Sequence, residues 1–202
     1  MARPREFDEQ VVLDAAVECF WSRGYEGTSV RDLIETTGLT GASLYNAFGD
    51  KRALFRAALD RYVESSIGER IKRCEALPPR DAIAAFFEDI LKRSLSDRQR
   101  KGCMLVNSAL EIAPHDAELR KIIVAVLSHI ETFFLGCIEA GQAEGTITRS
   151  MPAQEIAHHL LGVLMGVRVL ARVRPDRALL EGAVAPALAL LDGGDVRQVT
   201  RQ

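Results

Sequence analysis

The side chains with the most distinctive chemistry in this sequence are its cysteines and histidines. The four cysteines are widely scattered: Cys19, Cys74, Cys103 and Cys137. No two of them form a CxxC pair, so the sequence predicts neither a zinc site nor a disulfide framework. Cys103 follows Arg100 and Lys101 at an expected helix start, where the helix dipole and the two cations would favour a reactive thiolate. An inert buried thiol is the alternative for this position.

The four histidines do not form a recognisable metal site. His158 and His159 are adjacent, and neighbours on a helix point about 100° apart, so they cannot easily share one ion. His115 and His129 have no clear spacing to either. No nucleophile with a plausible base, no paired carboxylates and no phosphate-binding loop stand out. We therefore expect no metal site, no cofactor and no enzymatic activity.

Helices must position these side chains, because apolar residues recur at intervals of three and four along nearly the whole chain. No stretch of alternating β-branched residues is long enough to predict a sheet. The sequence predicts an all-α protein of about nine helices. An N-terminal domain, residues 1–63, would be joined by a long helix to a C-terminal helical bundle, residues 64–202.

The N-terminal domain is expected to contain three short helices. The first runs from about Asp8 to Arg23. Ser29 begins the second with a capping box that uses Asp32 in place of the usual Glu. Gly38 ends it, because a left-handed backbone costs a residue with a Cβ about 1 kcal/mol.

Thr40 can cap the third helix, which is expected to end near Phe48. Two short helices with a tight turn between them are typical of the helix-turn-helix motif, whose second helix lies in the major groove of DNA. Many small helical cores also use tight glycine turns, so the pattern alone is compatible with a purely structural role.

A long fourth helix is expected from Asp50 to about Cys74, followed by two prolines and five more helices. The five are expected at residues 80–95, 103–112, 116–143, 152–172 and 176–191.

The bulk properties favour a soluble globule. No uninterrupted apolar run approaches the roughly 20 residues of a membrane helix, and the first nine residues are polar, unlike a signal peptide. We therefore expect a cytoplasmic protein that does not enter a membrane. Because the net charge is −2, any DNA binding would depend on a local patch and on backbone donors at helix starts.

The segment GYEGTSVRDLIETTGLTGASLYNAFGDKRALF, residues 24–55, resembles the N-terminal domain of the TetR family of repressors. The shared features include an LY..F block followed by a small residue, Asp and Lys. Helix order and length are similar to the family's over the whole chain. The resemblance implies a transcription regulator that binds a pseudo-palindromic, double-stranded DNA operator as a dimer.

The resemblance also implies which residues contact DNA. Helix-start groups at Thr28, Ser29 and Lys51 would bind phosphates, and Tyr45 would contact the backbone or a base edge. The full expected set is Arg3, Arg5, Thr28, Ser29, Arg31, Thr40, Gly41, Ala42, Ser43, Tyr45, Asn46 and Lys51.

Gly41 departs from the family, because relatives often carry a long basic or polar side chain there. Its backbone could approach DNA closely, and Ala42 could touch a thymine methyl, so base recognition would depend on Asn46, on the neighbouring tyrosine and on DNA shape. Arg3 and Arg5 could form an arm that reaches a phosphate or the minor groove.

The C-terminal bundle of the family binds a small molecule and pairs two subunits through its last two helices. Here both helices carry more apolar residues than one small bundle need hide, and Gly162 and Gly166 permit close approach. We expect a homodimer through these helices, with packing inside one bundle as the alternative.

The effector is not identified by the sequence. The segment KGCMLVNSALEI, residues 101–112, resembles a subset of the family with a Gly-Cys step, and some of its members sense electrophiles or oxidants through that cysteine. A set of apolar and polar residues could line an effector pocket or form plain core. This set is Phe86, Phe87, Cys103, Met104, Asn107, Phe133, Phe134 and Met165.

Together these features predict a repressor that a small molecule, an oxidant or an electrophile releases from its operator. Effector binding in the bundle would move the fourth helix and change the separation of the two recognition helices. The alternative is a helical-bundle carrier of small molecules, or an enzyme, without DNA binding.

Overall fold

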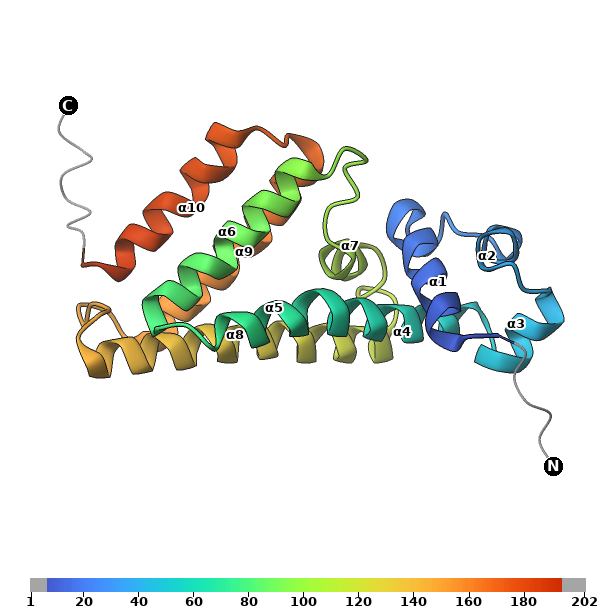
Figure 1. Cartoon of the computed structure of the whole chain (residues 1–202), viewed down its shortest axis with the longest axis horizontal. Helices are drawn as coiled ribbons and strands as arrows, with labels where there is room; N and C mark the ends of the chain where they lie inside the picture. The colour runs from blue at the N-terminus through green and yellow to red at the C-terminus, as the bar shows by residue number, and fades with distance from the viewer. Residues whose placement is uncertain (1–6, 194–202) are drawn as a thin grey trace. The chain divides into compact units, whose positions relative to one another are not determined.

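The computed structural model describes residues 7–193, and the regular elements of this part of the chain are all helices (Figure 1). In chain order they are α1 (Glu9–Arg23), α2 (Val30–Thr37), α3 (Gly41–Phe48), α4 (Lys51–Tyr62), the π-helical segment η1 (Val63–Gly68), α5 (Glu69–Cys74), α6 (Pro79–Ser96), α7 (Met104–Glu111), α8 (Ala117–Glu144), α9 (Ala153–Val173) and α10 (Arg177–Leu191). No loop separates α4, η1 and α5, which together correspond to the predicted long fourth helix. The predicted all-α fold of about nine helices is confirmed for the described residues.

The five predicted C-terminal helices correspond to α6 to α10, and every boundary agrees to within one residue. Proline accounts for two of the starts, because its fixed φ suits the first turn of a helix: Pro79 is the first residue of α6 and Pro152 directly precedes α9. Asp176 caps α10 by accepting a hydrogen bond from the Leu179 N–H at 2.9 Å.

The chain forms two compact units that interleave along the sequence. Of the described residues, unit 1 contains 7–68 together with Cys103–Ile123. Unit 2 contains Glu69–Gly102 and residues 124–193. These units differ from the expected division between residues 63 and 64, because α7 and the first two turns of α8 pack with the N-terminal helices.

The core of unit 1 is built where α1 packs against α4 and α2. Phe20 and Phe55 lie edge to face with ring centroids 5.0 Å apart, and both are almost fully buried. Leu33 of α2 and Leu44 of α3 are also buried, so each helix of the predicted helix-turn-helix contributes its apolar side to this core.

Side-chain caps define the helix starts of unit 1, as predicted. Ser29 and Asp32 form a reciprocal capping box at α2. Thr40 accepts a hydrogen bond from the Ser43 N–H at 3.2 Å and begins α3. Gly38, between these helices, has φ +70°, the left-handed conformation that the predicted turn requires.

The core of unit 2 is aromatic. Helices α6, α9 and α10 lie against one another (Figure 1), and a cluster of rings fills the space between α6 and α8. Phe87 and Phe134 stack with ring centroids 5.7 Å apart. Arg168 of α9 is buried and donates hydrogen bonds to Ser94 Oγ at 2.9 Å and to the Gly102 carbonyl at 2.8 Å.

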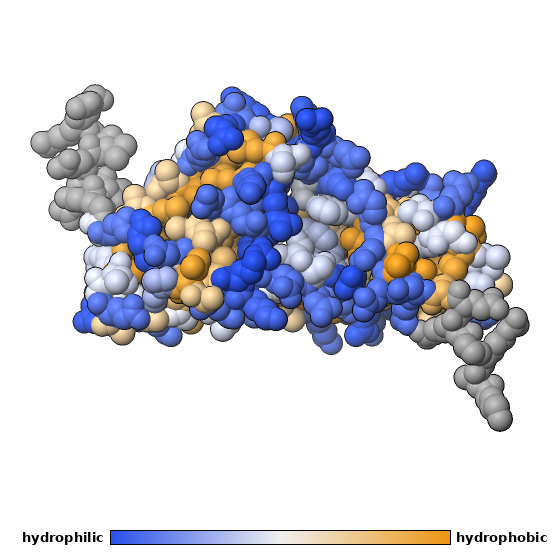
Figure 2. All heavy atoms as spheres, viewed as in Figure 1, coloured by the Kyte–Doolittle hydropathy of each residue, from blue (hydrophilic) through white to orange (hydrophobic). Residues whose placement is uncertain are grey.

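Helices α8 and α9 are long and apolar enough, by length and composition alone, to cross a membrane. Core helices of soluble proteins share this property, and both helices contribute to a core here. Phe134 and Ile138 of α8 and Leu160 and Leu164 of α9 are buried. Figure 2 shows further apolar side chains on the surface along α6 and α10.

Candidate nucleic-acid interface

Helix α3 has one buried side and one exposed side. Leu44 is 3% exposed and anchors the helix in unit 1, whereas Tyr45 is 45% exposed. Ala42 and Asn46 are exposed as well. The phenol and the carboxamide offer both donors and acceptors to a base edge or a phosphate, while the Ala42 methyl is suited to an apolar contact.

The start of α3 adds two hydroxyl groups to this surface. Thr40 is exposed, and its hydroxyl donates to Ser43 Oγ at 3.0 Å while capping the helix. Ser43 is half-buried. Both predicted contact residues therefore lie at the end of α3 where unpaired backbone N–H groups favour an anion.

Gly41 packs closely against the preceding helix. A Cβ at this position would lie 3.3 Å from Ile34 Cδ1 of α2, closer than ordinary van der Waals contact. The missing side chain thus accompanies a close approach of α3 to α2. The departure at Gly41 is visible in the sequence, but its packing reason is not, because that reason is a contact between two helices.

The start of α2 differs from the prediction at Thr28 and Ser29. Thr28 is fully buried, and its hydroxyl donates to the Gly24 carbonyl at 2.6 Å, so it is not available to a phosphate. The N–H and hydroxyl of Ser29 both donate to Asp32 Oδ2, at 2.8 and 2.6 Å. The capping box therefore uses the donors that were expected to bind DNA.

A carboxylate also occupies this helix start. Hydrogen bonds from Ser29, strengthened by the neighbouring Arg23, lower the pKa of Asp32 from its usual value. Arg31, one residue away, has a side chain that is 87% exposed and pairs with Glu35 at 2.9 Å. This exposed pair is weak, so the guanidinium can exchange its partner for a phosphate.

Lys51, the first residue of α4, has a defined position. Its Nζ lies 4.3 Å from the centroid of the Tyr25 ring, which is a cation–π contact. The Tyr25 ring packs edge to face on Phe55 at 5.0 Å. Asp50 caps the same helix by accepting from the Ala53 N–H at 2.7 Å. A lysine predicted to bind phosphate is thus held at a helix start on an aromatic support.

Two acidic side chains that no sequence pattern indicated contact these elements. Glu111 of α7 accepts hydrogen bonds from the backbone N–H groups of Tyr25 and Glu26. Asp116 forms a bidentate pair with Arg52, whose guanidinium holds the pKa of the carboxyl well below its usual range. In each of these contacts the two residues are more than 60 positions apart in the sequence, so no local pattern indicates the pairing.

Two predicted contact residues, Arg3 and Arg5, lie outside the described residues. Of the remaining ones, apart from Thr28 and Ser29, five are exposed and three are half-buried. The exposed ones are Arg31, Thr40, Ala42, Tyr45 and Asn46, and the half-buried ones are Gly41, Ser43 and Lys51.

Comparison with known proteins identifies this architecture. Residues 12–58 match the family described as "Bacterial regulatory proteins, tetR family", and residues 79–186 match "Tetracyclin repressor-like, C-terminal domain". The chain belongs to the TetR family of transcriptional regulators. The first match covers α2, α3 and most of the helices on either side of them, and the second covers the helices from α6 to most of α10.

Individual TetR-type relatives match over nearly the whole chain. The uncharacterized HTH-type transcriptional regulator YezE of Bacillus subtilis is 32% identical, over 95% of this chain and 100% of its own length. The HTH-type transcriptional repressor ComR of Escherichia coli is 29% identical, over 96% and 90%. A solved complex of a cysteine mutant of the TetR family regulator CifR with 26 bp operator DNA is 33% identical, covers 93% of this chain and 98% of that chain, and has a TM-score of 0.82.

The residues predicted to line an effector pocket in this TetR-family chain are not collected in one place. Phe86, Phe87 and Phe134 are at most 1% exposed and pack on one another, so the plain-core interpretation describes them. Met165 is half-buried in unit 2. The three expected residues of α7 and its cap belong to unit 1: Cys103, Met104 and Asn107.

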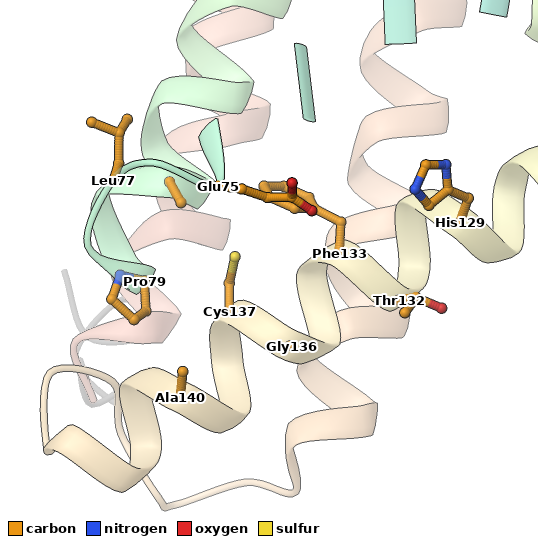
Figure 3. A pocket seen from close by; sticks show the side chains of 10 residues that line it. Glu75, Leu77, Pro79, His129, Thr132, Phe133, Gly136, Cys137 and Ala140 are labelled. Carbon is orange, nitrogen blue, oxygen red and sulfur yellow. The ribbon is translucent and has the colours of Figure 1, made fainter. Parts of the chain in front are cut away.

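Unit 2 nevertheless contains an open cavity of about 310 Å³ (Figure 3). Of the predicted pocket residues, Phe133 lines it, together with Glu75, His129 and Cys137. Burial raises the pKa of the Cys137 thiol to about 11, so this sulfur is protonated at neutral pH. Within residues 7–193, no three His, Cys, Asp or Glu side chains meet as metal ligands.

Cys103 occupies the N-cap position of α7 and is 8% exposed. The Tyr62 hydroxyl donates to its sulfur at 3.6 Å. Tyr62 in turn packs edge to face on Trp21 at 5.1 Å. A hydroxyl donor and the start of a helix both stabilise negative charge on sulfur.

Proposed function

We propose that this regulator is a cytoplasmic repressor that binds a pseudo-palindromic operator as a homodimer, without enzymatic activity of its own. A small molecule, an oxidant or an electrophile releases it from the operator. The exposed side of α3, with Tyr45 and Asn46 beside the two α3 hydroxyls, is the observation that carries this proposal. The operator complex of the similar protein CifR supports it.

DNA recognition divides between two groups of side chains. Asn46 contacts a base edge and Tyr45 contacts the DNA backbone or a base edge, with DNA shape compensating for the missing side chain at Gly41. Arg31 and Lys51 contact phosphates and set the register of α3 in the groove. Since the chain has a net charge of −2, these few cations carry the electrostatic part of binding.

The outer side of α9 supports the homodimer. Val169 and Val173 are 42% and 72% exposed, which is unfavourable for a monomer in water. Gly162 and Gly166 are exposed, and a Cβ at either would meet nothing within 4 Å in this chain. A second copy of α9 and α10 would cover these residues, with the glycines permitting close approach.

Cys103 is the effector-responsive group in this proposal. The Tyr62 hydroxyl donates a hydrogen bond to its sulfur, which lies at the N-cap position of α7. It forms the first residue of a segment that packs with the DNA-binding helices in unit 1. Modification of the sulfur therefore acts on the same compact unit that contacts DNA.

The proposal is tested by fluorescence anisotropy with a labelled duplex from the region upstream of the chain's own gene. We expect this duplex to bind more tightly than a scrambled duplex at about 0.15 M salt, and log Kd to rise linearly with log salt concentration. Tyr45→Ala should abolish the preference while leaving the dimer intact by analytical ultracentrifugation. Equal affinity of the wild-type chain for both duplexes would favour the carrier or enzyme alternative.

A further inference from the structure

The Glu111 carboxylate connects α7 to the turn that precedes α2. Glu111 Oε2 accepts the Tyr25 N–H at 3.2 Å, and Oε1 accepts the Glu26 N–H at 2.8 Å. Two backbone donors on one carboxylate form a charge-assisted contact that defines the position of the peptide plane. The turn therefore depends on an acid from a distant part of the sequence.

Gly24 provides the space for this contact. It has φ +78°, and a Cβ there would lie 2.8 Å from Glu111 Oε2 and 3.1 Å from Oε1. No other residue type satisfies both the backbone angle and the approach of the carboxylate. Gly24 thus ends α1 and at the same time admits the side chain of Glu111.

The contact continues from the turn to a DNA-contacting cation. Tyr25, whose N–H Glu111 binds, places its ring 4.3 Å from Lys51 Nζ. Phe55 packs edge to face against the same ring, with the centroids 5.0 Å apart. A shift of the Tyr25 backbone therefore moves the surface on which the Lys51 ammonium lies.

A second acidic contact joins the same two parts of unit 1. Arg52, next to Lys51, pairs with Asp116 at 2.6 and 2.9 Å and with Glu118 at 2.8 Å. The end of α7 and the start of α8 are thus attached to both the turn before α2 and the start of α4. These contacts lie on the same segment as Glu111, so the segment meets unit 1 at two places.

We propose that Glu111 is a positioning residue for DNA binding, which acts through the Tyr25 ring to hold the Lys51 ammonium toward a phosphate. The inference rests on the proposed DNA-binding function and deepens it. Glu111 is the last residue of α7, and Cys103 caps the other end. Eight helical residues span only about 12 Å, so a displacement at the cap reaches Glu111 through one rigid helix.

The test compares the salt dependence of operator binding in wild-type, Glu111→Gln, Lys51→Ala and double-variant chains by anisotropy on the upstream duplex. Gln replaces one acceptor oxygen by an NH₂ donor that faces a backbone N–H, so one of the two hydrogen bonds is lost. Loss of one phosphate contact in each subunit of the homodimer should lower the slope of log Kd against log salt by about 1.8 in each single variant. Because both act on one contact, the double variant should lose no more than Lys51→Ala alone.

The sign of the effect separates positioning from simple electrostatics. Removing an acid from a DNA-binding unit should strengthen binding through the general field. Glu64→Gln, an exposed acid of unit 1, is the charge-matched control and should bind as tightly as the wild type or more tightly. Glu111→Gln should instead weaken binding by roughly three- to tenfold for each half-site of the operator at 0.1–0.2 M salt.

Glu111→Asp keeps the charge but shortens the side chain, and it should weaken binding in the same direction. If the Glu111→Gln variant does not fold, the Glu111→Asp variant provides a second test. In the free protein, hydrogen exchange of the Tyr25 and Glu26 amides should become faster in both variants. Suppose that the wild type prefers the operator. If the Glu111 variants then keep the wild-type slope of log Kd against log salt, and their Tyr25 and Glu26 amides exchange no faster than in the wild type, the role of Glu111 alone is refuted. A wild type without that preference would instead refute the proposed function, and the role of Glu111 with it.

Discussion

The starts of α2 and α4 are built from similar residues but offer different surfaces to an anion. At α2, the Ser29 donors bind Asp32, so a carboxylate covers the helix start. At α4, Asp50 caps a backbone N–H, while Lys51 extends over an aromatic ring. An N-cap residue therefore predicts where a helix begins but not whether the start of that helix is free to bind phosphate.

Both helix starts depend on one aromatic core, so damage to that core should remove the difference between them. Phe55→Ala removes the ring that supports Phe20 and Tyr25 and should lower the free energy of unfolding by about 3–5 kcal/mol. Urea unfolding followed by the fluorescence of the single tryptophan, Trp21 in unit 1, measures this loss. A loss below 1 kcal/mol would show that the two helix starts do not share this core.

Ser29→Ala tests whether the cap of α2 contacts phosphate. The capping interaction disappears, and the free energy of unfolding should fall by about 1 kcal/mol. At temperatures where the variant is fully folded, the slope of log Kd for the operator against log salt concentration should equal that of the wild type, because Ser29 donates to Asp32 rather than to DNA. A lower slope in this variant would restore Ser29 as a phosphate contact.

Lys51→Ala is the matching change at α4. The Asp50 cap stays, so the urea midpoint should change little. Kd for the operator should rise, and its increase between 0.05 and 0.2 M salt should be about tenfold smaller than in the wild type, because the homodimer loses one phosphate contact in each subunit. Anisotropy titrations at several salt concentrations measure both the affinity and the slope. Equal slopes for this variant and the wild type would place the phosphate contact elsewhere.

The smallest expected effect is a pH dependence confined to α2. Hydrogen bonds from Ser29 and the ion pair with Arg23 lower the pKa of Asp32 in the folded state below its usual 3.8. The stabilisation that this carboxylate contributes is therefore fully present above about pH 4 and lost as the pH falls through the folded-state pKa. Asp32→Asn should lower the urea midpoint at pH 7 and have less effect at pH 3. An equal effect at both pH values would exclude the ionised form as the source.

Local sequence patterns predicted the helices and caps well because these depend on residues three or four positions apart. Gly38, Ser29 with Asp32, and Thr40 are cases in which the stabilising partner lies within the same helix or turn. The same patterns could not show that Thr28 is buried, because its environment is supplied by the surrounding helices. The all-α fold was therefore easier to predict from the sequence than the chemistry of individual site residues.

Most of the features that the sequence did not predict are contacts between distant segments. Glu111 binds a turn 85 residues earlier, and nothing in the sequence around either partner indicates the pairing. The predicted effector residues shared an apolar character, which also suits core. Burial of Phe86, Phe87 and Phe134 in one aromatic cluster depends on how α6 and α8 pack, which periodicity alone does not specify.

The close approach of α3 to α2 has a consequence for redesigning operator preference. A longer side chain at position 41 must first displace Ile34 Cδ1, which lies 3.3 Å from where the new Cβ would sit. Ile34→Val deletes that methyl group, so the two positions are best varied as one pair. A library that randomises only residue 41 would therefore confound altered base recognition with altered helix packing, whereas a paired library would separate them.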